Sequence, residues 1–401
     1  MKILHVIPSV GPLRGGPSFV LRTMTRGLVK AGVEVHVVTT DDNGIACLDV
    51  PLNEPVLEDG VTYRYFHRQI HPYVTSIPLA KWLFNEIEKY DVVHIHVVFS
   101  WASTMAAWAA AARGVPYIIR PLGVLNRWGM ENRRPWLKRL SFRLFERRSL
   151  ENAAAVQYTS EQERDEAEKL SFRGKGTVIG NPVDVPECRP IRGAFRSRHP
   201  EIGDKFMYLF LSRIDAKKGV ELLISAFANA RNVCPEALLV IAGDGPAELV
   251  SALRQQAARS GVTNAIIWVG FLQGNEKWEA ITDADAFVLS SYSENFGVAV
   301  VEAMALGIPV VVSDQVGISS AIQTARAGIV TGCDADDFGH ALVRIAANPA
   351  LREEMGLSAQ RLAESEFSSR AISRKLIDLY KSIEHDNRDG LMRNDTVHAN
   401  Q

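Results

Sequence analysis

The sequence predicts an α/β protein made of two doubly wound, parallel-sheet domains. Its 401 residues suit two domains of about 180–200 residues better than one compact domain. In both halves, short β-branched runs alternate with segments of helical period, which is typical of a parallel sheet covered on both faces. A stretch rich in proline and glycine separates the halves. We therefore expect domains at 1–182 and 206–370, a linker at 183–205, and a C-terminal helix at 371–401 that crosses back to the first domain.

Each expected strand is a short apolar run that stops at a turn or polar residue. In the first half, a helix over 18–30 ends at Gly32, which readily takes the left-handed position after a helix. The strands of this half are expected at 2–8, 33–40, 91–98, 115–121 and 153–160. Those of the second half are expected at 207–214, 237–243, 265–271, 286–291 and 309–314. Two such domains facing each other across a central cleft place a ligand at the carboxyl ends of their strands.

Charge, cysteine content and hydropathy limit the kind of protein. A formal net charge of −1 argues against a whole-protein nucleic-acid footprint, which needs a clear basic excess. The four cysteines lack C-x-x-C spacing, so they predict core residues in a reducing compartment and no zinc site. The first apolar run is too short for a signal peptide, and the longest uncharged stretch, 97–112, is too short to span a bilayer. We expect a cytoplasmic protein.

The strongest motif is SSYSENFGVAVVEAMALGIPVVVSD at 290–314. Glu294 follows a strand, and a helix is expected to begin near Gly297, with its free amides and positive dipole end directed at an anion such as a diphosphate. Glu302, in the same helix, can accept hydrogen bonds from a ribose diol, and Glu294 can accept them from sugar hydroxyls. The alternative is that both carboxylates merely favour the helix dipole.

A second motif, FLSRIDAKKG at 210–219, places Arg213 after a strand and Lys218 where a helix begins. A cation there is unfavourable to the helix dipole, so a bound diphosphate explains it better than stability does, although a solvated surface cation remains the alternative. The turns that contain Gly243 and Gly270 end two further strands on the same edge. Glycines there let a ligand approach the backbone, or simply make turns.

These segments resemble family 4 of the retaining glycosyltransferases, whose GT-B fold has two Rossmann-like domains. The resemblance rests on SRIDAKKG, IAGDGP, VGF and ENFGVAVVEAMALGIPVV, and it extends over nearly the whole chain. It implies that Arg213 and Lys218 bind the donor diphosphate, Glu302 the ribose and Glu294 the donor sugar. The other donor-binding residues that it implies are Gly16, Gly243, Gly270, Phe271, Asn295, Phe296, Gly297 and Val298.

In the first half, the resemblance bears on a glycine loop and a histidine pair. Gly16 resembles the family glycine whose backbone packs against the donor phosphate and the acceptor. His94 and His96 face the same side of their strand because side chains alternate. The family places the second histidine of this pattern beside the anomeric carbon, so we expect His96, with His94 as the second choice, to be catalytic together with Glu294, Arg213 and Lys218. A buried, hydrogen-bonded histidine is the alternative, and the sequence shows no third ligand for a metal.

The acceptor side is expected on the loop after the fourth strand, at Arg120, Asn126 and Arg127. The segment 127–148 that follows is basic and carries Trp136, Leu140 and Leu144 at helical spacing. Such a helix can lie on the inner face of the cell membrane as a peripheral contact, or dock on the sheet with a charged outer face. A membrane contact would suit a polyprenyl-linked acceptor.

No metal or other cofactor is expected. Asp283 and Asp285 imitate a D-x-D metal motif, but Asp285 lies at a helix end, where a turn or capping role is simpler. The predicted function is transfer of a hexose, with retention, from a nucleotide-diphosphate sugar to a saccharide or lipid-linked saccharide in bacterial polysaccharide synthesis. Uridine is preferred as the base on family frequency. The alternatives are a nucleotide-sugar epimerase or hydrolase, and an inactive nucleotide-sugar-binding protein.

Overall fold

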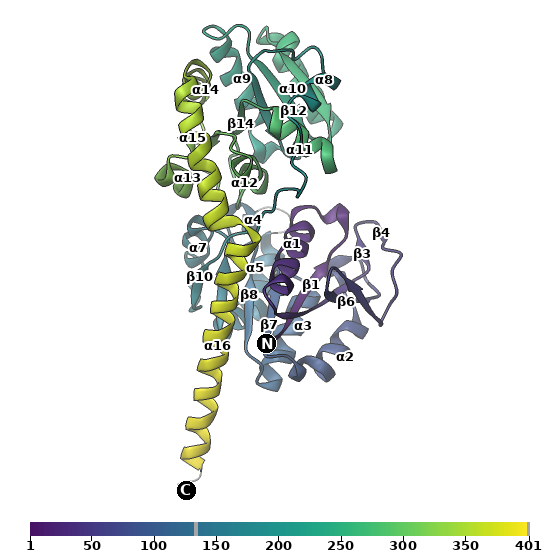
Figure 1. Ribbon diagram of the computed structural model, residues 1–401. Coiled ribbons are helices and arrows are strands. Elements are labelled where there is room, and N and C mark those ends of the chain that lie inside the picture. The colour runs from purple at the N-terminus through teal and green to yellow at the C-terminus, as the bar shows by residue number, and fades with distance from the viewer. Residues whose placement is uncertain (132–134, 399–401) are drawn as a thin grey trace. The chain divides into compact units, whose positions relative to one another are not determined.

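The structure is a computed structural model that describes residues 1–131 and 135–398 (Figure 1). The chain divides into two compact units. The first unit holds Met1–Pro182 together with the segment from Ser369 onward, and the second holds Val183–Ser368. Each unit has its own sheet and its own buried core, with helices on both faces of the sheet, which confirms the expected α/β layering.

The first unit contains an eight-stranded sheet in the order β10-β9-β8-β7-β1-β2-β6-β5. All of its neighbouring strands are parallel except β5 and β6. The strands are β1 (Lys2–Ser9), β2 (Glu34–Thr40), β5 (Pro55–Glu58), β6 (Val61–Phe66), β7 (Val92–His96), β8 (Tyr117–Arg120), β9 (Ala155–Tyr158) and β10 (Gly176–Val178). A short antiparallel ladder joins β3 (Asp42–Asn43) to β4 (Ala46–Cys47).

Two apolar clusters cover the two faces of this sheet. One face packs against α1 (Gly16–Lys30) and α16 (Ser369–His398) through residues such as Leu28 and Leu376. The other packs against α2 (Ile77–Glu86) and α3 (Trp101–Arg113). The remaining helical segments are η1 (Pro12–Arg14), η2 (Pro72–Val74), η3 (Ile87–Lys89), α4 (Arg127–Glu131), α5 (Pro135–Ser141), η4 (Phe142–Glu146), α6 (Arg147–Glu151) and α7 (Glu161–Glu168).

The second unit contains a six-stranded, all-parallel sheet in the order β13-β12-β11-β14-β15-β16. Its strands are β11 (Met207–Leu211), β12 (Leu238–Ala242), β13 (Ile266–Gly270), β14 (Ala286–Leu289), β15 (Val310–Ser313) and β16 (Gly328–Thr331). Its helical segments are α8 (Ala194–Arg198), η5 (Ala216–Lys218), α9 (Val220–Arg231), α10 (Ala247–Arg259), η6 (Thr263–Ala265), α11 (Gly274–Asp283), α12 (Val298–Ala305), α13 (Ser319–Ala325), α14 (Ala335–Ala347), α15 (Pro349–Leu362) and η7 (Ala363–Phe367).

In both units the strand order reverses beside the first strand of the sheet. β1 lies between β7 and β2, and β11 lies between β12 and β14. The loops after these strands diverge to opposite sides, which leaves a crevice at the carboxyl edge of each sheet. The fold therefore directs attention to the residues that follow β1 and β7 in one unit and β11 and β14 in the other.

Residues 183–205 are not the linker that the sequence predicts, because they form part of the second unit. Helix α8 lies in this stretch, and Phe195 and Ile202 are buried in the apolar core of that unit. The Asp283 carboxylate, which is fully buried, accepts the backbone N–H of Phe195 at 2.8 Å and of Arg196 at 2.9 Å. Proline and glycine break regular structure, but they do not prevent a segment from packing.

The same contacts account for the D-x-D sequence. Asp285 accepts hydrogen bonds from the Arg196 guanidinium at 2.8 Å and from the Met207 N–H at 2.9 Å. Asp283 and Asp285 therefore hold α8 against the end of α11 and the start of β11, all within the second unit.

Over residues 1–131 and 135–398, every helix is either too short or too polar to cross a membrane.

Candidate functional site

At the carboxyl edge of the second sheet, a lysine meets a glutamate. Lys218 ends η5 and is 7% exposed, and its ammonium donates to the carboxylate of Glu294, in the loop after β14. The turn requires a glycine, since Gly219 has φ +62° and a Cβ there would lie 2.2 Å from the carbonyl oxygen of Ser290. Arg213, two residues after β11, is exposed. The edge therefore presents an exposed guanidinium and a partly buried ion pair.

The Glu294 carboxylate is ionised and held in place. Burial disfavours its charge, but the ammonium groups of Lys218 and Lys217 and the N–H of Phe296 outweigh burial and lower its pKa. Its backbone is fixed as well, because the Glu294 N–H donates to Gln315 at 3.0 Å and its carbonyl accepts from Gly317 at 2.8 Å. A sugar hydroxyl that reached this position would meet a preorganised acceptor.

Helix α12 begins directly after this loop. Gly297, its N-cap, has φ 91°, a conformation that favours glycine. Phe296 is 2% exposed and packs edge-on against Phe367, which anchors the start of the helix. Asn295 and Val298, on either side, are half-buried. The first amides of a helix lack intrahelical partners and carry its positive dipole end, so this terminus suits an anion.

Glu302 forms a second lysine–glutamate pair on the same edge. It lies in α12, and its carboxylate accepts from Lys277 of α11 at 2.7 Å. Burial raises the pKa of Glu302, and Lys277 opposes that rise. The sequence analysis missed Lys277, since a single lysine on an amphipathic helix gives no signal of its own. Both glutamates that the sequence selects are therefore paired with lysines of other elements.

A cavity of about 430 Å³ lies nearby in the second unit. Gly243, Trp268 and Gly270 contribute to its wall. A Cβ at Gly243 would lie 1.9 Å from the Ser212 carbonyl oxygen, and Gly270 has φ +72°, so both positions require glycine. Phe271 is 64% exposed. The Arg254 guanidinium, which also lines this cavity, lies over the Trp268 ring, 5.0 Å from its centroid.

In the first unit, Gly16 begins α1 and is exposed, and a Cβ placed on it would meet nothing within 4 Å. The position is therefore open to a ligand, as the sequence analysis expects of this loop. Gly15 before it has φ +74° and serves as the cap of the helix. The loop before α1 is held against the first turn of the helix, because the Ser18 hydroxyl donates a hydrogen bond to the Gly11 carbonyl oxygen at 3.0 Å.

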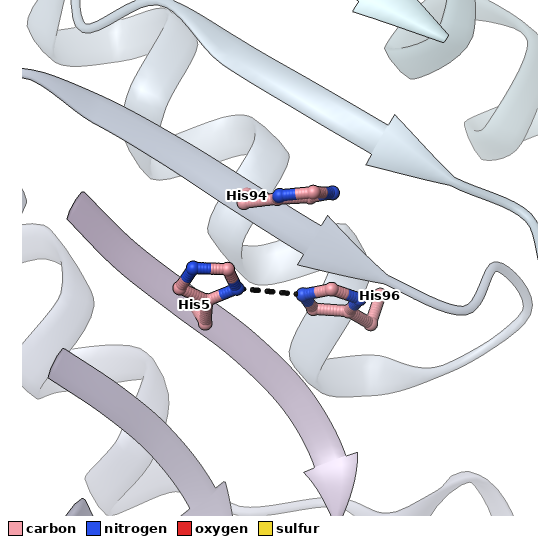
Figure 2. A group of neighbouring side chains, drawn as sticks. All are labelled: His5, His94 and His96. Carbon is pink, nitrogen blue, oxygen red and sulfur yellow. Dashed lines mark hydrogen bonds between the residues drawn. The ribbon is translucent and has the colours of Figure 1, made fainter. Parts of the chain in front are cut away.

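The histidines of the first unit form a buried cluster of three (Figure 2). His5 of β1, His94 and His96 of β7 are each 0% exposed. His5 Nδ1 and His96 Nε2 share a hydrogen bond of 2.9 Å, and His94 Nδ1 lies 2.7 Å from the Tyr380 hydroxyl of α16. The sequence analysis did not find His5, although β1 and β7 pair with His5 opposite His94.

These imidazoles are neutral. Burial first, and then the Arg120 guanidinium, lower the pKa of His5 to about 3. Burial and the neighbouring rings lower the pKa of His94 and His96 well below the ordinary value. His96 therefore does not reach a ligand in the conformation described. Its expected place beside the donor sugar stays a prediction that requires the chain after β7 to move.

Three neutral histidines can hold a metal such as zinc, and these offer ligand atoms within 4.8 Å of one another. The ring planes, however, are close to parallel, with angles of 14°, 20° and 31° between them. A tetrahedral ion needs nitrogens of three rings to converge on one point, whereas two of these nitrogens are hydrogen-bonded to each other. The arrangement does not fit a metal centre, and we assign none.

Arg120 is not the acceptor contact that the sequence predicts. It ends β8, is 1% exposed and donates to the Asn181 amide oxygen, so no ligand can touch it. Burial lowers its pKa to about 10. Asn126 accepts the N–H of Gly129 at 2.6 Å, which fixes the start of α4. Arg127 is the first residue of α4, and its side chain lies outside the described part.

Comparison with known proteins decides the family. Residues 15–182 match the family described as glycosyl transferase 4-like domain, and residues 192–362 match glycosyl transferases group 1. The chain is a group 1 glycosyltransferase. The first match falls in the first unit and the second match falls in the second unit.

Relatives of the glycosyltransferase agree with this assignment. A D-inositol 3-phosphate glycosyltransferase of Catenulispora acidiphila is 28% identical over 398 residues, which cover 92% of this chain and 91% of that protein. An alpha-maltose-1-phosphate synthase of Mycolicibacterium smegmatis is 28% identical over 322 residues, which cover 75% of this chain and 81% of that protein.

Solved structures show that the glycosyltransferase has the GT-B fold. HepE of Anabaena, solved with UDP and glucose, superposes with a TM-score of 0.75 at 19% identity, over 95% of this chain and all of HepE. WaaG, involved in lipopolysaccharide biosynthesis, gives a TM-score of 0.67 at 17% identity, over 94% of this chain and 99% of WaaG. The expected fold class is thereby confirmed.

Proposed function

We propose that the glycosyltransferase transfers a hexose from a UDP-sugar to a saccharide or lipid-linked saccharide, with retention of the anomeric configuration, in bacterial polysaccharide synthesis. The observation that carries the proposal is the edge of the second sheet, where Arg213, the Lys218–Glu294 pair and the start of α12 meet. Uridine as the base is supported by HepE, the structural neighbour that was solved with UDP and glucose.

In the proposed donor site, Lys218 exchanges its partner Glu294 for the diphosphate when the donor binds. As they stand, Lys218 and Glu294 neutralise each other. A diphosphate offers Lys218 a doubly charged partner, which releases the Glu294 carboxylate to accept hydrogen bonds from the donor sugar. The Lys277–Glu302 ion pair can open in the same way, so that the Glu302 carboxylate accepts hydrogen bonds from the ribose diol. The cavity beside Trp268 then takes the base.

Departure of the diphosphate is the demanding step, because negative charge grows on its oxygens. In this proposal Arg213, Lys218 after its release from Glu294, and the amino end of α12 donate hydrogen bonds to that charge. No general base is assigned. We propose that the departing diphosphate oxygen accepts the proton of the acceptor hydroxyl on the same face of the sugar, which accounts for retention.

A titration of the whole protein with UDP-glucose, GDP-mannose and ADP-glucose tests the donor. At 100 times its dissociation constant, the true donor raises the free energy of unfolding by about 2.7 kcal/mol. Transfer to an oligosaccharide acceptor, followed by NMR of the new anomeric proton, then tests retention. Release of free sugar at the same rate with and without acceptor would make the protein a hydrolase, and binding without any turnover would make it a binding protein.

We also propose a contact between the segment 127–148 and an anionic membrane surface. Residues 132–134 lie outside the described part. In the rest, the stripe that the sequence predicts is exposed instead of docked on the sheet, with Trp136 at 68%, Leu140 at 48% and Leu144 at 57%. Exposed arginines interleave with it, at positions 139, 143, 147 and 148. Tryptophan and leucine beside arginine suit the headgroup region of a bilayer.

A further inference from the structure

An aspartate, a cysteine and a histidine meet beside the outer strands of the first unit. Asp41 directly follows β2, His67 directly follows β6, and Cys47 ends the short strand β4. Their ligand atoms, one from each side chain, lie within 4.8 Å of one another. The sequence predicts no zinc site, because Cys47 has no C-x-x-C partner and the three residues belong to different elements. Neither the proposed donor site nor the segment 127–148 uses them.

Strand pairing brings the three residues together. β2 and β6 are parallel and stay in register to their last residues, so Asp41 and His67 are the next residues on neighbouring strands. The Asp41 N–H continues the pairing, since it donates to the Phe66 carbonyl oxygen at 2.9 Å. The β3–β4 ladder then returns Cys47 to the same place, where the Leu48 N–H donates to the Asp41 carbonyl oxygen at 2.7 Å. The backbone therefore fixes where the three side chains begin.

The Asp41 carboxylate is buried, at 3% exposure, and the histidine is its one side-chain partner among the bonds described for residues 1–131 and 135–398. Its Oδ2 accepts from His67 Nδ1 at 2.8 Å, and its Oδ1 accepts the backbone N–H of Arg68 at 2.7 Å. The Arg68 guanidinium donates instead to Asp42 and to the Gly44 carbonyl oxygen. Buried carboxylates are normally paired with a cation or bound to a metal, and an imidazole is cationic only when protonated.

The chemistry of these three ligands suits zinc. Zinc takes thiolate, imidazole and carboxylate, and the ligand atoms of a tetrahedral zinc site lie about 3.3–3.6 Å apart. Cys47 is exposed and the His67 side chain is 56% exposed, so both can rotate to that spacing around the fixed Asp41 carboxylate. The three histidines of β1 and β7 have no such freedom, because they are fully buried. Calcium and magnesium need several oxygen ligands, whereas one of these three residues supplies oxygen.

We propose that Asp41, Cys47 and His67 bind a zinc ion, with water as the fourth ligand. The ion takes the place of the hydrogen bond between His67 Nδ1 and Asp41 Oδ2. The imidazole proton passes through solvent to Nε2, and the Cys47 thiol releases its proton to solvent. The dication then balances one thiolate and one carboxylate. The ion joins the β3–β4 ladder to the ends of β2 and β6, a structural role that is independent of the proposed donor site.

Titration with Co²⁺ tests the inference on the whole chain, prepared without an affinity tag and kept reduced. Cobalt is expected to bind as a single ion per chain and to give the near-ultraviolet absorption of a thiolate–cobalt bond. Zn²⁺ should then displace it and abolish the absorption, which yields the zinc affinity by competition. A cobalt spectrum without the thiolate band would place the ion elsewhere, for example at the histidine cluster, and would overturn the proposal. Absence of binding would overturn it as well.

Variants at the two exposed ligands identify the site. Cys47→Ser and His67→Gln should each weaken zinc binding about 100-fold, because even a residue that only orients a metal ligand contributes about 10–100-fold. The matched controls are Cys188→Ser and His340→Gln, at exposed residues of the second unit, and they should stay within about twofold.

Hydrogen exchange tests the structural role. Zinc should slow exchange of the amides of residues 42–48 in the wild type but not in Cys47→Ser. Unchanged zinc affinity in Cys47→Ser and His67→Gln refutes the site, and unchanged exchange in the wild type refutes the role of the ion in holding the β3–β4 ladder.

Discussion

The two sheets of the glycosyltransferase carry different polar groups. Within β1 and β7, the buried polar side chains are the neutral imidazoles of a three-histidine cluster without any exposed surface. At the end of β11 and β14, they are carboxylates paired with lysines. Both sheets reverse their strand order at the first strand, so topology is not the source of the difference. The switch point sets where a ligand can bind, and the side chains there set the charge that it meets.

The largest expected effect concerns acid stability of the first unit. The pKa of His5 is lowered from 6.5 to about 3, so between these values the unfolded chain binds a proton that the folded unit does not. Stability is therefore complete above pH 6.5 and falls as pH drops, by up to about 5 kcal/mol for His5 alone. Hydrogen exchange of β1 amides between pH 8 and pH 4 measures this loss.

The variant His5→Gln should flatten that pH dependence, because glutamine keeps a hydrogen bond to His96 but has no proton to gain. His340→Gln, at an exposed histidine of the second unit, is the control. An unchanged slope in His5→Gln would show that the buried imidazoles do not distinguish the two edges.

The next effect concerns the charged edge of the second unit. Arg213→Ala should lower the transfer rate about 10²–10³-fold, the usual cost of removing one preorganised donor from a developing negative charge. Since Arg213 is exposed, the free energy of unfolding should change by less than about 0.5 kcal/mol. Initial rates with saturating donor, together with urea unfolding, test both parts. Arg259→Ala, at an exposed arginine of α10, should leave the rate unchanged, and an equal rate in Arg213→Ala would remove this residue from the site.

A third effect concerns Glu146 of the first unit, a buried acid without a cationic partner among the bonds described. Burial raises its pKa from 4.5 to about 7. The folded unit therefore binds a proton that the unfolded chain has lost, and stability falls as pH rises from 4.5 to 7. Glu146→Gln removes this loss and should be more stable than the wild type at pH 8, by up to about 3 kcal/mol, but not at pH 4.5. Urea unfolding of the first unit at both pH values measures the difference.

Glu168→Gln, at an exposed acid of α7, is the control for that measurement. A gain in Glu146→Gln that is equal at both pH values would mean that packing, and not ionisation, is responsible.

The smallest effect concerns the exposed arginines of the segment 127–148 in the first unit. Arg143→Gln should weaken binding to vesicles of phosphatidylcholine and phosphatidylglycerol about fivefold, since one basic residue near an anionic surface contributes about 1 kcal/mol. Cosedimentation at low salt measures it, with Arg26→Gln of α1 as control. Equal loss in both variants would indicate a general charge effect and no defined contact.

The sequence predicted the fold and the residues of the charged edge because both leave local signals. Periodicity and turn residues reveal strands and helices, and Glu294, Glu302 and Lys218 stand at fixed positions around a helix start. What the sequence does not show is which elements meet. Lys277 belongs to another helix, and His5 becomes the third histidine only through the pairing of β1 with β7.

The other differences between the sequence-based predictions and the structure also arise because the sequence does not show which elements pack together. Arg120 looked accessible because it ends a strand, but β8 lies inside the sheet, between β7 and β9. The positive φ angles of Val97 and Phe99, after β7, gave no signal because valine and phenylalanine rarely take this conformation. Residues 183–205 were expected to be a linker because composition shows where regular structure breaks, not whether a segment is buried.

The contact between Tyr380 and His94 joins residues 286 positions apart in the sequence. Helix α16 also supplies Ile372 and Leu376 to the core beneath β1, so part of that face of the sheet has no cover until the ribosome has made the whole second unit. The second unit is contiguous and can mature during synthesis, whereas the first must wait for its returning helix. A gene split at Pro182 therefore has to carry 369–398 with its first half.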